Sequence, residues 1–167
     1  MDQDMHSGET TPVTRALDEL NIPYRFFRHP GKVSSLEQAA RERGQNPEQV
    51  IRSLVFRLAK GSYVMVLVAG PSQISWPGLR AYLGQSRLTM AEESEILSIT
   101  GYPIGAVSPL GLPDPLRVLV DRSVVQDGEI SIGSGERYTT VILAGPDLMK
   151  ALGPVEVDQF VKQEAGT

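Results

Sequence analysis

The spacing of apolar residues predicts that helices and strands are interspersed along the chain. After Thr11-Pro12, apolar residues recur three and four positions apart, which is typical of an amphipathic helix, and this helix ends near Asn21. Capping residues and the glycines that follow them predict further helices at 36–43, 47–53, 76–83, 90–98 and 146–152. Apolar runs rich in β-branched residues predict strands at 24–27, 54–59, 63–70, 117–121, 129–133 and 139–144.

Short turns join several of the predicted strands. Lys60-Gly61-Ser62 separates two apolar runs and predicts a hairpin, and Asp127-Gly128 and Ser134-Gly135-Glu136 supply two more turns. Strands joined by tight turns pair antiparallel, whereas a purely parallel sheet needs a crossover between every pair. The sequence therefore predicts an α+β fold with a mixed sheet.

The segment ITGYPIGAVSPLGL, residues 99–112, fits neither a helix nor a central strand. It has three glycines, two prolines and no charge in fourteen residues. Glycines let backbone N–H groups approach a ligand closely, and prolines fix the path of the chain. The segment is therefore either an oxyanion hole or small-group pocket built from main chain, or a buried, tightly turned crossover. The second glycine-rich turn, at 133–137, offers the same choice.

Composition excludes several classes of site. The chain of 167 residues has no cysteine and only two histidines, His6 and His29. Disulfides, cysteine nucleophiles and cysteine metal sites are thereby excluded, and a metal site built on histidine is not expected. No run of eighteen apolar residues is present, and the acidic start MDQDMHSGET is unlike a signal peptide. We therefore expect a cytoplasmic protein with no membrane segment.

Positive charge is concentrated in one part of the chain. The net charge is −4, yet residues 25–60 carry eight of the 16 lysines and arginines against three glutamates. A basic patch of this kind could contact phosphate groups. The alternative is a set of solvated helix faces with no ligand.

Three blocks of sequence resemble the YbaK/ProX family of aminoacyl-tRNA deacylases, which are related to the editing domain of bacterial prolyl-tRNA synthetases. The blocks are TGYPIGAVSPLGL at 100–112, GSGERYTTVILAGPDLMKAL at 133–152 and NPEQVIRSLVFRL at 46–58. The resemblance extends over about residues 12–157. It implies a mixed, partly barrel-like β-sheet surrounded by helices, and hydrolysis of the ester between a wrong small amino acid, such as cysteine or alanine, and tRNA, often the tRNA for proline. We expect no cofactor and no metal.

The resemblance also implies a basic catalytic residue, and here the chain departs from the family. The family has a lysine at the end of the helix before the first hairpin strand, and the aligned residue is Arg52. Ser53 follows where threonine is usual. Arginine stays protonated, so Arg52 could grip a carbonyl or phosphate oxygen but could not act as a base. The alternative is that Arg52 is a surface residue of the helix.

The glycine-rich segments supply the other residues expected at the site. By resemblance, Gly101 and Gly105 present backbone N–H groups to the ester or to its attacking water and so count as catalytic with Arg52. The residues expected to bind substrate, besides Ser53, are His29, Tyr102, Ser108, Pro109, Gly133, Ser134 and Gly135. Three have simpler alternatives, because His29 could be a surface turn residue, Tyr102 could pack in the core and Ser108 could cap a turn.

These features predict one deacylase domain at 11–160, between a disordered head at 1–10 and a frayed tail at 161–167. The expected partner is the acceptor 3′ end of tRNA, with an aminoacyl-tRNA synthetase as a further partner, and the expected state is a monomer. A binding module of the same fold that holds aminoacyl-tRNA or a small ligand without cleaving it is the alternative function. A hydrolase of other acyl esters is a third.

Overall fold

The computed structural model describes residues 10–163 and shows an α+β protein with five α-helices and eight strands among these residues. Residues 1–9 and 164–167, which include most of the predicted head and tail, lie outside the described part. The helices are α1 (Pro12–Glu19), α2 (Leu36–Arg43), α3 (Trp76–Leu83), α4 (Glu93–Thr100) and α5 (Gly145–Leu152). The strands are β1 (Arg25–Arg28), β2 (Ile51–Arg57), β3 (Tyr63–Ala69), β4 (Thr89–Met90), β5 (Arg117–Asp121), β6 (Glu129–Gly133), β7 (Thr139–Ala144) and β8 (Glu156–Asp158).

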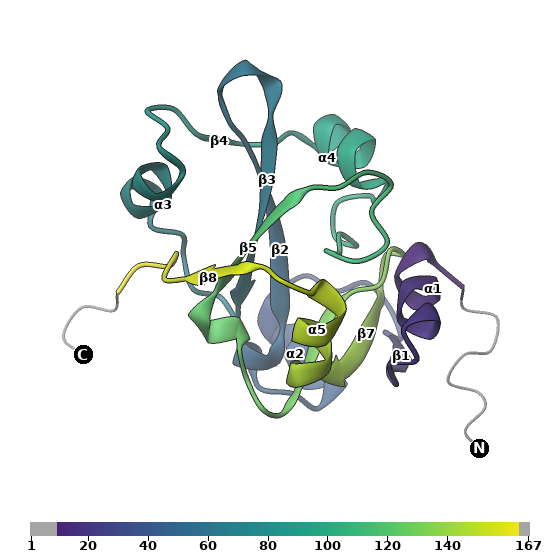
Figure 1. Cartoon of the computed structure of the whole chain (residues 1–167). Coiled ribbons are helices and arrows are strands. Elements are labelled where there is room, and N and C mark those ends of the chain that lie inside the picture. Colours follow the sequence, from purple (N-terminus) through teal and green to yellow (C-terminus); the bar gives the residue numbers. More distant parts are fainter. Residues whose placement is uncertain (1–9, 164–167) are drawn as a thin grey trace.

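The strands form two sheets, ordered β1-β7-β6 and β4-β2-β3-β5-β8. β3–β5 and β5–β8 pair in parallel and the other pairs are antiparallel, so the predicted mixed sheet is confirmed. An isolated bridge between Val50 and Ser131 brings the two sheets together. The helices lie around the outside, with α3 and α4 towards one end of the larger sheet and α1 and α5 beside the smaller one (Figure 1). The sheets curl towards each other without closing, which gives the expected partly barrel-like form.

Local capping explains where the predicted helices begin and end. The Ser35 hydroxyl accepts a hydrogen bond from the Gln38 N–H at 3.0 Å, and α2 ends at Gly44 in the left-handed conformation with φ 71°. Ser75 and Gly84 do the same for α3. None of the helices in residues 10–163 has the length and apolar character needed to cross a bilayer.

Two predicted helices are wrong in part. The Asn46-Pro47 signal produces only a single 3₁₀ turn, Pro47–Gln49, and the chain then enters β2. Arg52 and Ser53 therefore lie on a strand and not at a helix end. The helix predicted at 90–98 begins at Glu93, because Thr89 and Met90 pair with the end of β2.

β2 separates the two apolar cores of the protein. Its residues Ile51 and Val55 belong to one buried cluster, between the two sheets, whereas Phe56 belongs to another, on the side of α3. Successive side chains of a strand point to opposite faces. Ser53 therefore shares the face of Ile51 and Val55, and Arg52 shares the face of Phe56.

Candidate functional site

A cavity of about 310 Å³ lies where β2 meets β6, β7 and the glycine-rich segment. Its walls are apolar for the most part, with two arginines and three hydroxyl side chains. The lining residues are Arg43, Val50, Ile51, Arg52, Ser53, Leu54, Val55, Met90, Ile96, Ile104, Gly105, Val107, Ile132, Gly133, Thr139 and Thr140. Four of the predicted site residues, Arg52, Ser53, Gly105 and Gly133, are among them.

Ser53 is the hydroxyl in this wall that lacks a hydrogen bond. Its Oγ is buried and has no partner among the described residues. The hydroxyls of Thr139 and Thr140, by contrast, donate to the carbonyls of Glu136 and Ile132 at 2.6 and 2.7 Å. A buried polar group without a partner costs about 1–3 kcal/mol, so packing alone does not account for this hydroxyl.

The backbone of Ser53 lies along the edge of β2 that β3 leaves open. The Val55 carbonyl accepts from the Ala91 N–H at 2.9 Å on this edge, whereas the Val50 carbonyl accepts from the Gly70 N–H on the β3 side. Backbone polar groups alternate along a strand, so the N–H and C=O of Ser53 share the edge of Val55. Ser53 thus brings a hydroxyl and a main-chain donor to the same wall.

Arg52 is held by the turn that follows β3. Its Nε donates to the Gly70 carbonyl at 2.7 Å, and its Nη2 donates to the Ser72 carbonyl. Burial lowers the pKa of the guanidinium from its ordinary value. Its side chain leaves the face of β2 opposite to that of Ser53, so Arg52 borders both the cavity and a separate hollow of about 270 Å³ beside Phe56 and Trp76, with two of its nitrogens engaged by main chain.

The two glycines that line the cavity have different roles. Gly105, at φ 91°, is exposed, and its N–H makes no hydrogen bond to any residue within 10–163. Gly133 allows a close approach, because a Cβ there would lie 2.0 Å from the Val107 carbonyl oxygen. Gly105 therefore offers a free donor, and Gly133 lets the glycine-rich segment sit against β6.

A second hollow, of about 260 Å³, adjoins the cavity through Arg43, Ile104, Gly105 and Thr139. It is more polar, and His29, Val33, Arg137 and Tyr138 complete its lining. Tyr138 is exposed and has φ 65°, which is uncommon outside glycine and clusters at functional sites. Of the predicted site residues, His29 and Gly105 line this second hollow.

A buried polar chain lies behind the second hollow. His29 Nδ1 lies 2.5 Å from Glu42 Oε1, and Arg43 Nε donates to His29 Nε2 at 3.1 Å. Arg43 Nη1 donates to Ser131 Oγ at 2.8 Å, which in turn donates to Gln45 Oε1. Arg43 is the site residue that the sequence did not reveal, because it looks like an ordinary basic residue in the last turn of α2.

Other predicted site residues have structural roles. The Gly101 N–H donates to the Leu97 carbonyl at 2.8 Å and ends α4, so this N–H is engaged within the helix. Tyr102 is buried, and its hydroxyl donates to the Leu110 carbonyl at 2.7 Å. Ser108 is also buried, and its Oγ accepts from the Leu110 N–H. None of these three residues lines the cavity.

In the second glycine-rich turn, too, some predicted site residues make structural hydrogen bonds and one lines the cavity. Ser134 is buried, and its hydroxyl bonds to Thr139 Oγ1 and to the main chain of Glu136. Gly135, at φ 94°, donates its N–H to the Ala106 carbonyl at 3.0 Å. The bond from Gly135 to Ala106 fastens the turn to the glycine-rich segment next to the cavity. Of the residues in this turn, Gly133 lines the wall of the cavity.

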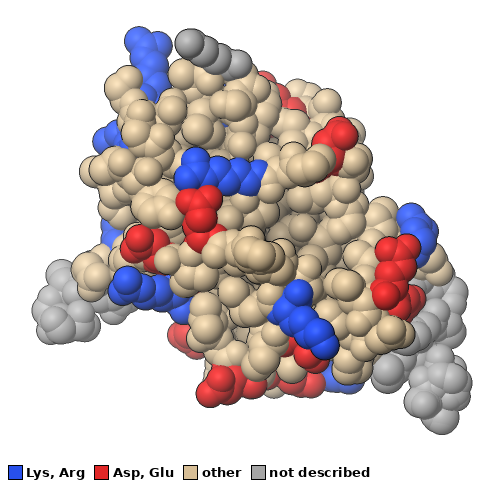
Figure 2. Space-filling model, viewed as in Figure 1, with Lys and Arg blue, Asp and Glu red and all other residues tan. Residues whose placement is uncertain are grey.

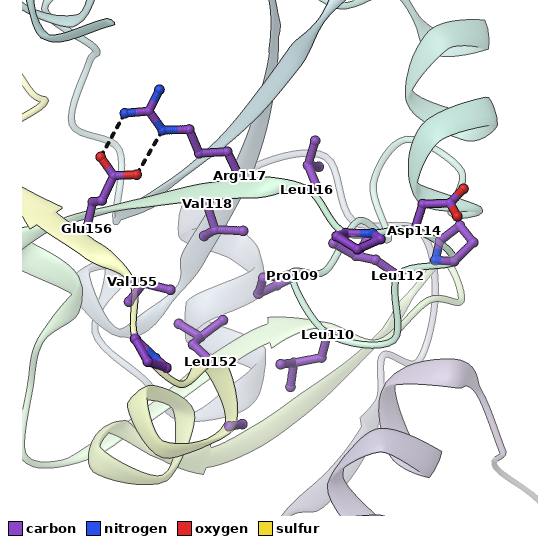
Figure 3. Close-up of a pocket in the computed structure, with 14 residues that line it drawn as sticks. Pro109, Leu110, Leu112, Asp114, Leu116, Arg117, Val118, Leu152, Val155 and Glu156 are labelled. Carbon is purple, nitrogen blue, oxygen red and sulfur yellow. Dashed lines mark hydrogen bonds and ion pairs between the residues drawn. The ribbon is translucent and has the colours of Figure 1, made fainter.

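Pro109 lines a different and larger hollow, of about 720 Å³, between the stretch after the glycine-rich segment and the end of α5. Leu110, Val118, Leu152 and Val155 line this space from several sides (Figure 3). At its edge Arg117 donates two hydrogen bonds to Glu156, both at 2.8 Å, and this pair lowers the pKa of Glu156 to about 2. Arg117 and Glu156 thus neutralise each other, and Asp114 is the other charged residue in this lining.

Part of the positive charge of residues 25–60 is paired with acidic residues from elsewhere in the chain. Arg25 pairs with Glu129, Arg28 with Glu136 and Arg57 with Glu95, at 3.0–3.2 Å, and all three acids lie outside residues 25–60. On the face shown in Figure 2, basic and acidic side chains are intermixed on a largely uncharged surface. The local excess of charge is therefore partly neutralised by other strands and helices.

Comparison with known proteins places the chain in a family. Residues 30–151 match the family model of the aminoacyl-tRNA editing domain. The chain is 33% identical over 100 residues to proline–tRNA ligase of Thermosipho melanesiensis, and this covers 60% of the chain and 17% of the ligase. It is 29% identical over 133 residues to proline–tRNA ligase of Pelobacter propionicus, covering 80% of the chain and 23% of the ligase. The chain thus matches about a fifth of the length of these ligases.

Solved structures share the fold. A crystal structure of a protein proposed to be a trans-editing enzyme for prolyl-tRNA synthetase superposes with a TM-score of 0.82 at 24% identity, covering 94% of the chain and 99% of that protein. The hypothetical protein APE2540 gives 0.81 at 20% identity, covering 91% and 100%. Since the family model spans most of the sequence, the chain belongs to the aminoacyl-tRNA editing domain family.

Proposed function

We propose that this protein is a trans-editing hydrolase that removes a wrongly attached small amino acid from tRNA. The observation that carries the proposal is the 310 Å³ cavity, whose apolar wall contains the unpartnered Ser53 Oγ and the free Gly105 N–H. A cavity of this size is at the small end of ligand pockets and has room for a small acyl group together with part of the terminal ribose. Because a synthetase discriminates poorly among small side chains, at about 1–3 kcal/mol per methylene, a second sieve of this kind is needed.

The lining of the cavity favours polarisation of the ester over general-base catalysis by a side chain. Its ionisable lining residues within the described chain are Arg43 and Arg52, and neither a carboxylate nor a histidine is among them. Water attacks the ester carbonyl carbon, the bond to the ribose oxygen breaks, and the amino acid leaves with a free carboxyl group. Main-chain N–H groups stabilise the developing oxyanion. The neighbouring ribose hydroxyl of the substrate assists the proton transfer.

Arg52 is proposed to shape this wall and to orient the acyl ester through the nitrogen that the Gly70 and Ser72 carbonyls leave free. We expect Arg52→Ala to lower kcat/KM for a mischarged tRNA by about 100-fold, and Arg52→Lys by less, because one ammonium can bind a carbonyl but cannot reproduce the fork. Multiple-turnover deacylation of alanyl-, cysteinyl-, seryl- and prolyl-tRNA measures this. Unfolding of each variant by urea separates loss of chemistry from loss of fold.

The same assay decides between the proposal and its alternatives. A hydrolase consumes excess ester at substoichiometric protein, whereas a non-catalytic module of this fold protects or retains the ester. A hydrolase of other acyl esters cleaves free aminoacyl esters without needing tRNA. If wild type cleaves none of the four tRNAs, the proposed hydrolase function is wrong. If Arg52→Ala cleaves them at the wild-type rate, the proposed role of Arg52 is wrong.

The proposal has three further parts. The protein contacts the acceptor 3′ end of tRNA, it is a monomer in the cytoplasm, and it associates with a synthetase. The partial neutralisation of the basic segment reduces the number of phosphate contacts expected outside the site. Affinity for tRNA should therefore fall only moderately with salt.

A further inference from the structure

We propose that Arg43 binds an oxygen of the substrate at the junction of the cavity and the second hollow, and that the buried His29, held by Glu42, positions it. The inference rests on the proposed function for the identity of the substrate. The oxygen belongs either to the ester or to the terminal phosphodiester of tRNA, which share the same chemistry as acceptors of charged N–H donors.

The hydrogen bonds of Arg43 leave one end of its guanidinium for a ligand. Nε is occupied by His29 Nε2 and Nη1 by Ser131 Oγ, at 3.1 and 2.8 Å. Nη2 makes no bond to any residue of the described chain, and it is not among the buried polar atoms that lack a partner. Nη2 is thus open to the hollows that Arg43 lines.

The tautomer of His29 follows from its neighbours. Arginine can only donate, so Nε2 of His29 must accept from Arg43. The ring proton is therefore on Nδ1 and points at Glu42, whose other oxygen accepts from Gln38 Nε2 at 2.9 Å. The bonds from Gln38 and then from His29 hold the pKa of Glu42 below its ordinary value. With its side chain 1% exposed and its Nδ1 in contact with Glu42, His29 is held in place as the acceptor for Arg43.

Within residues 10–163, Arg43 makes no ion pair with a carboxylate. Burial lowers its pKa to about 10, and the nearby charge of Glu42 opposes this, so Arg43 keeps its charge at neutral pH. An arginine without an ion pair at the edge of an apolar cavity is ready to pair with a negative or developing negative oxygen. The free Gly105 N–H lines both hollows as well, so the two donors approach the same space.

The first test removes the guanidinium. We expect Arg43→Met to weaken binding of a non-hydrolysable, amide-linked alanyl-tRNA by about 10- to 100-fold, since hydrogen bonds to charged groups contribute that much. Arg41→Met, on the exposed side of α2, is the matched control and should bind like wild type. Weaker binding of deacylated tRNA as well identifies the phosphate oxygen, whereas unchanged binding of deacylated tRNA identifies the ester oxygen.

The second test asks whether His29 acts through Arg43. His29→Gln retains an acceptor for Arg43 Nε, so it should bind the amide analogue nearly as tightly as wild type. His29→Leu removes this acceptor and should bind the analogue weakly. In the Arg43→Met background the two His29 substitutions should bind alike, whereas a merely structural role of His29 would weaken binding independently of Arg43.

The outcomes separate this inference from the proposed function. If wild type binds the amide analogue but releases no amino acid from alanyl-tRNA, the hydrolase fails and Arg43 still stands. If Arg43→Met binds both RNAs as Arg41→Met does, or if His29→Leu binds the amide analogue as tightly as His29→Gln, the inference is overturned. If wild type binds neither RNA, both proposals are overturned.

Discussion

Replacing Gly133 with alanine is expected to lower the free energy of unfolding by about 3 kcal/mol or more and to abolish activity. The added Cβ would lie 2.0 Å from the carbonyl oxygen and 2.7 Å from the carbonyl carbon of Val107. These are backbone atoms, so no side-chain rotation relieves the contact. Either β6 or the glycine-rich segment must move, and the cavity lies between them. Urea denaturation and the deacylation assay measure the two losses.

Gly105→Ala is the matched control for this substitution. No atom lies within 4 Å of a Cβ at Gly105, and the cost there is confined to a backbone at φ 91°, about 1–2 kcal/mol. We therefore expect Gly105→Ala to remain folded. Equal stability of the Gly133→Ala and Gly105→Ala proteins would show that the glycine-rich segment does not pack on β6 as described.

Asp121→Ala is expected to cost about 3–5 kcal/mol of stability. The carboxylate is buried at the end of β5, and Oδ2 accepts from the Ser123 N–H and hydroxyl at 3.0 and 2.6 Å. Oδ1 accepts from the N–H groups of Phe160 and Val161 at 2.7 and 3.2 Å. Alanine would leave these donors without an acceptor and release the segment that buries Phe160. Thermal and urea unfolding measure the loss.

Two further variants sharpen this prediction. Asp121→Asn keeps Oδ1 for Phe160 and Val161 but turns an NH₂ group towards Ser123, so its cost should be intermediate. Asp114→Ala removes an exposed carboxylate and should change stability by less than about 0.5 kcal/mol. If Asp121→Ala is no less stable than Asp114→Ala, Asp121 does not anchor the C-terminal segment.

Local signals predicted the fold where tertiary pairing agreed with them. The strands at 117–121, 129–133 and 139–144 and the helices at 36–43 and 76–83 have the predicted bounds. The helix at 47–53 failed because Ile51–Arg57 pairs with the whole of β3, and this ladder outweighs the capping signal of Pro47. β8 was missed because three residues, Glu156–Asp158, carry too short a pattern, and their pairing with β5 is set by distant sequence.

The site was predictable only in part, for a related reason. Glycine and proline content singled out the segment that bounds the cavity, and Gly105 and Gly133 lie in its wall. Which N–H groups are free depends on the hydrogen bonds of the folded chain, and Gly101 uses its own to end α4. The environment of Arg43 depends on Ser131, 88 residues further along the chain, and no local pattern reports such a contact.

The central claim is that the cavity at Ser53 receives the acyl group, and Ser53→Val tests it most directly. Valine suits a strand, removes a buried hydroxyl that has no partner and fills part of the cavity. We predict equal or greater stability than wild type, together with a loss of deacylation of about 100-fold, whereas Ser53→Ala keeps the space and loses less. A stable Ser53→Val protein that deacylates mischarged tRNA at the wild-type rate would contradict the account, because the acyl group would then have to bind elsewhere.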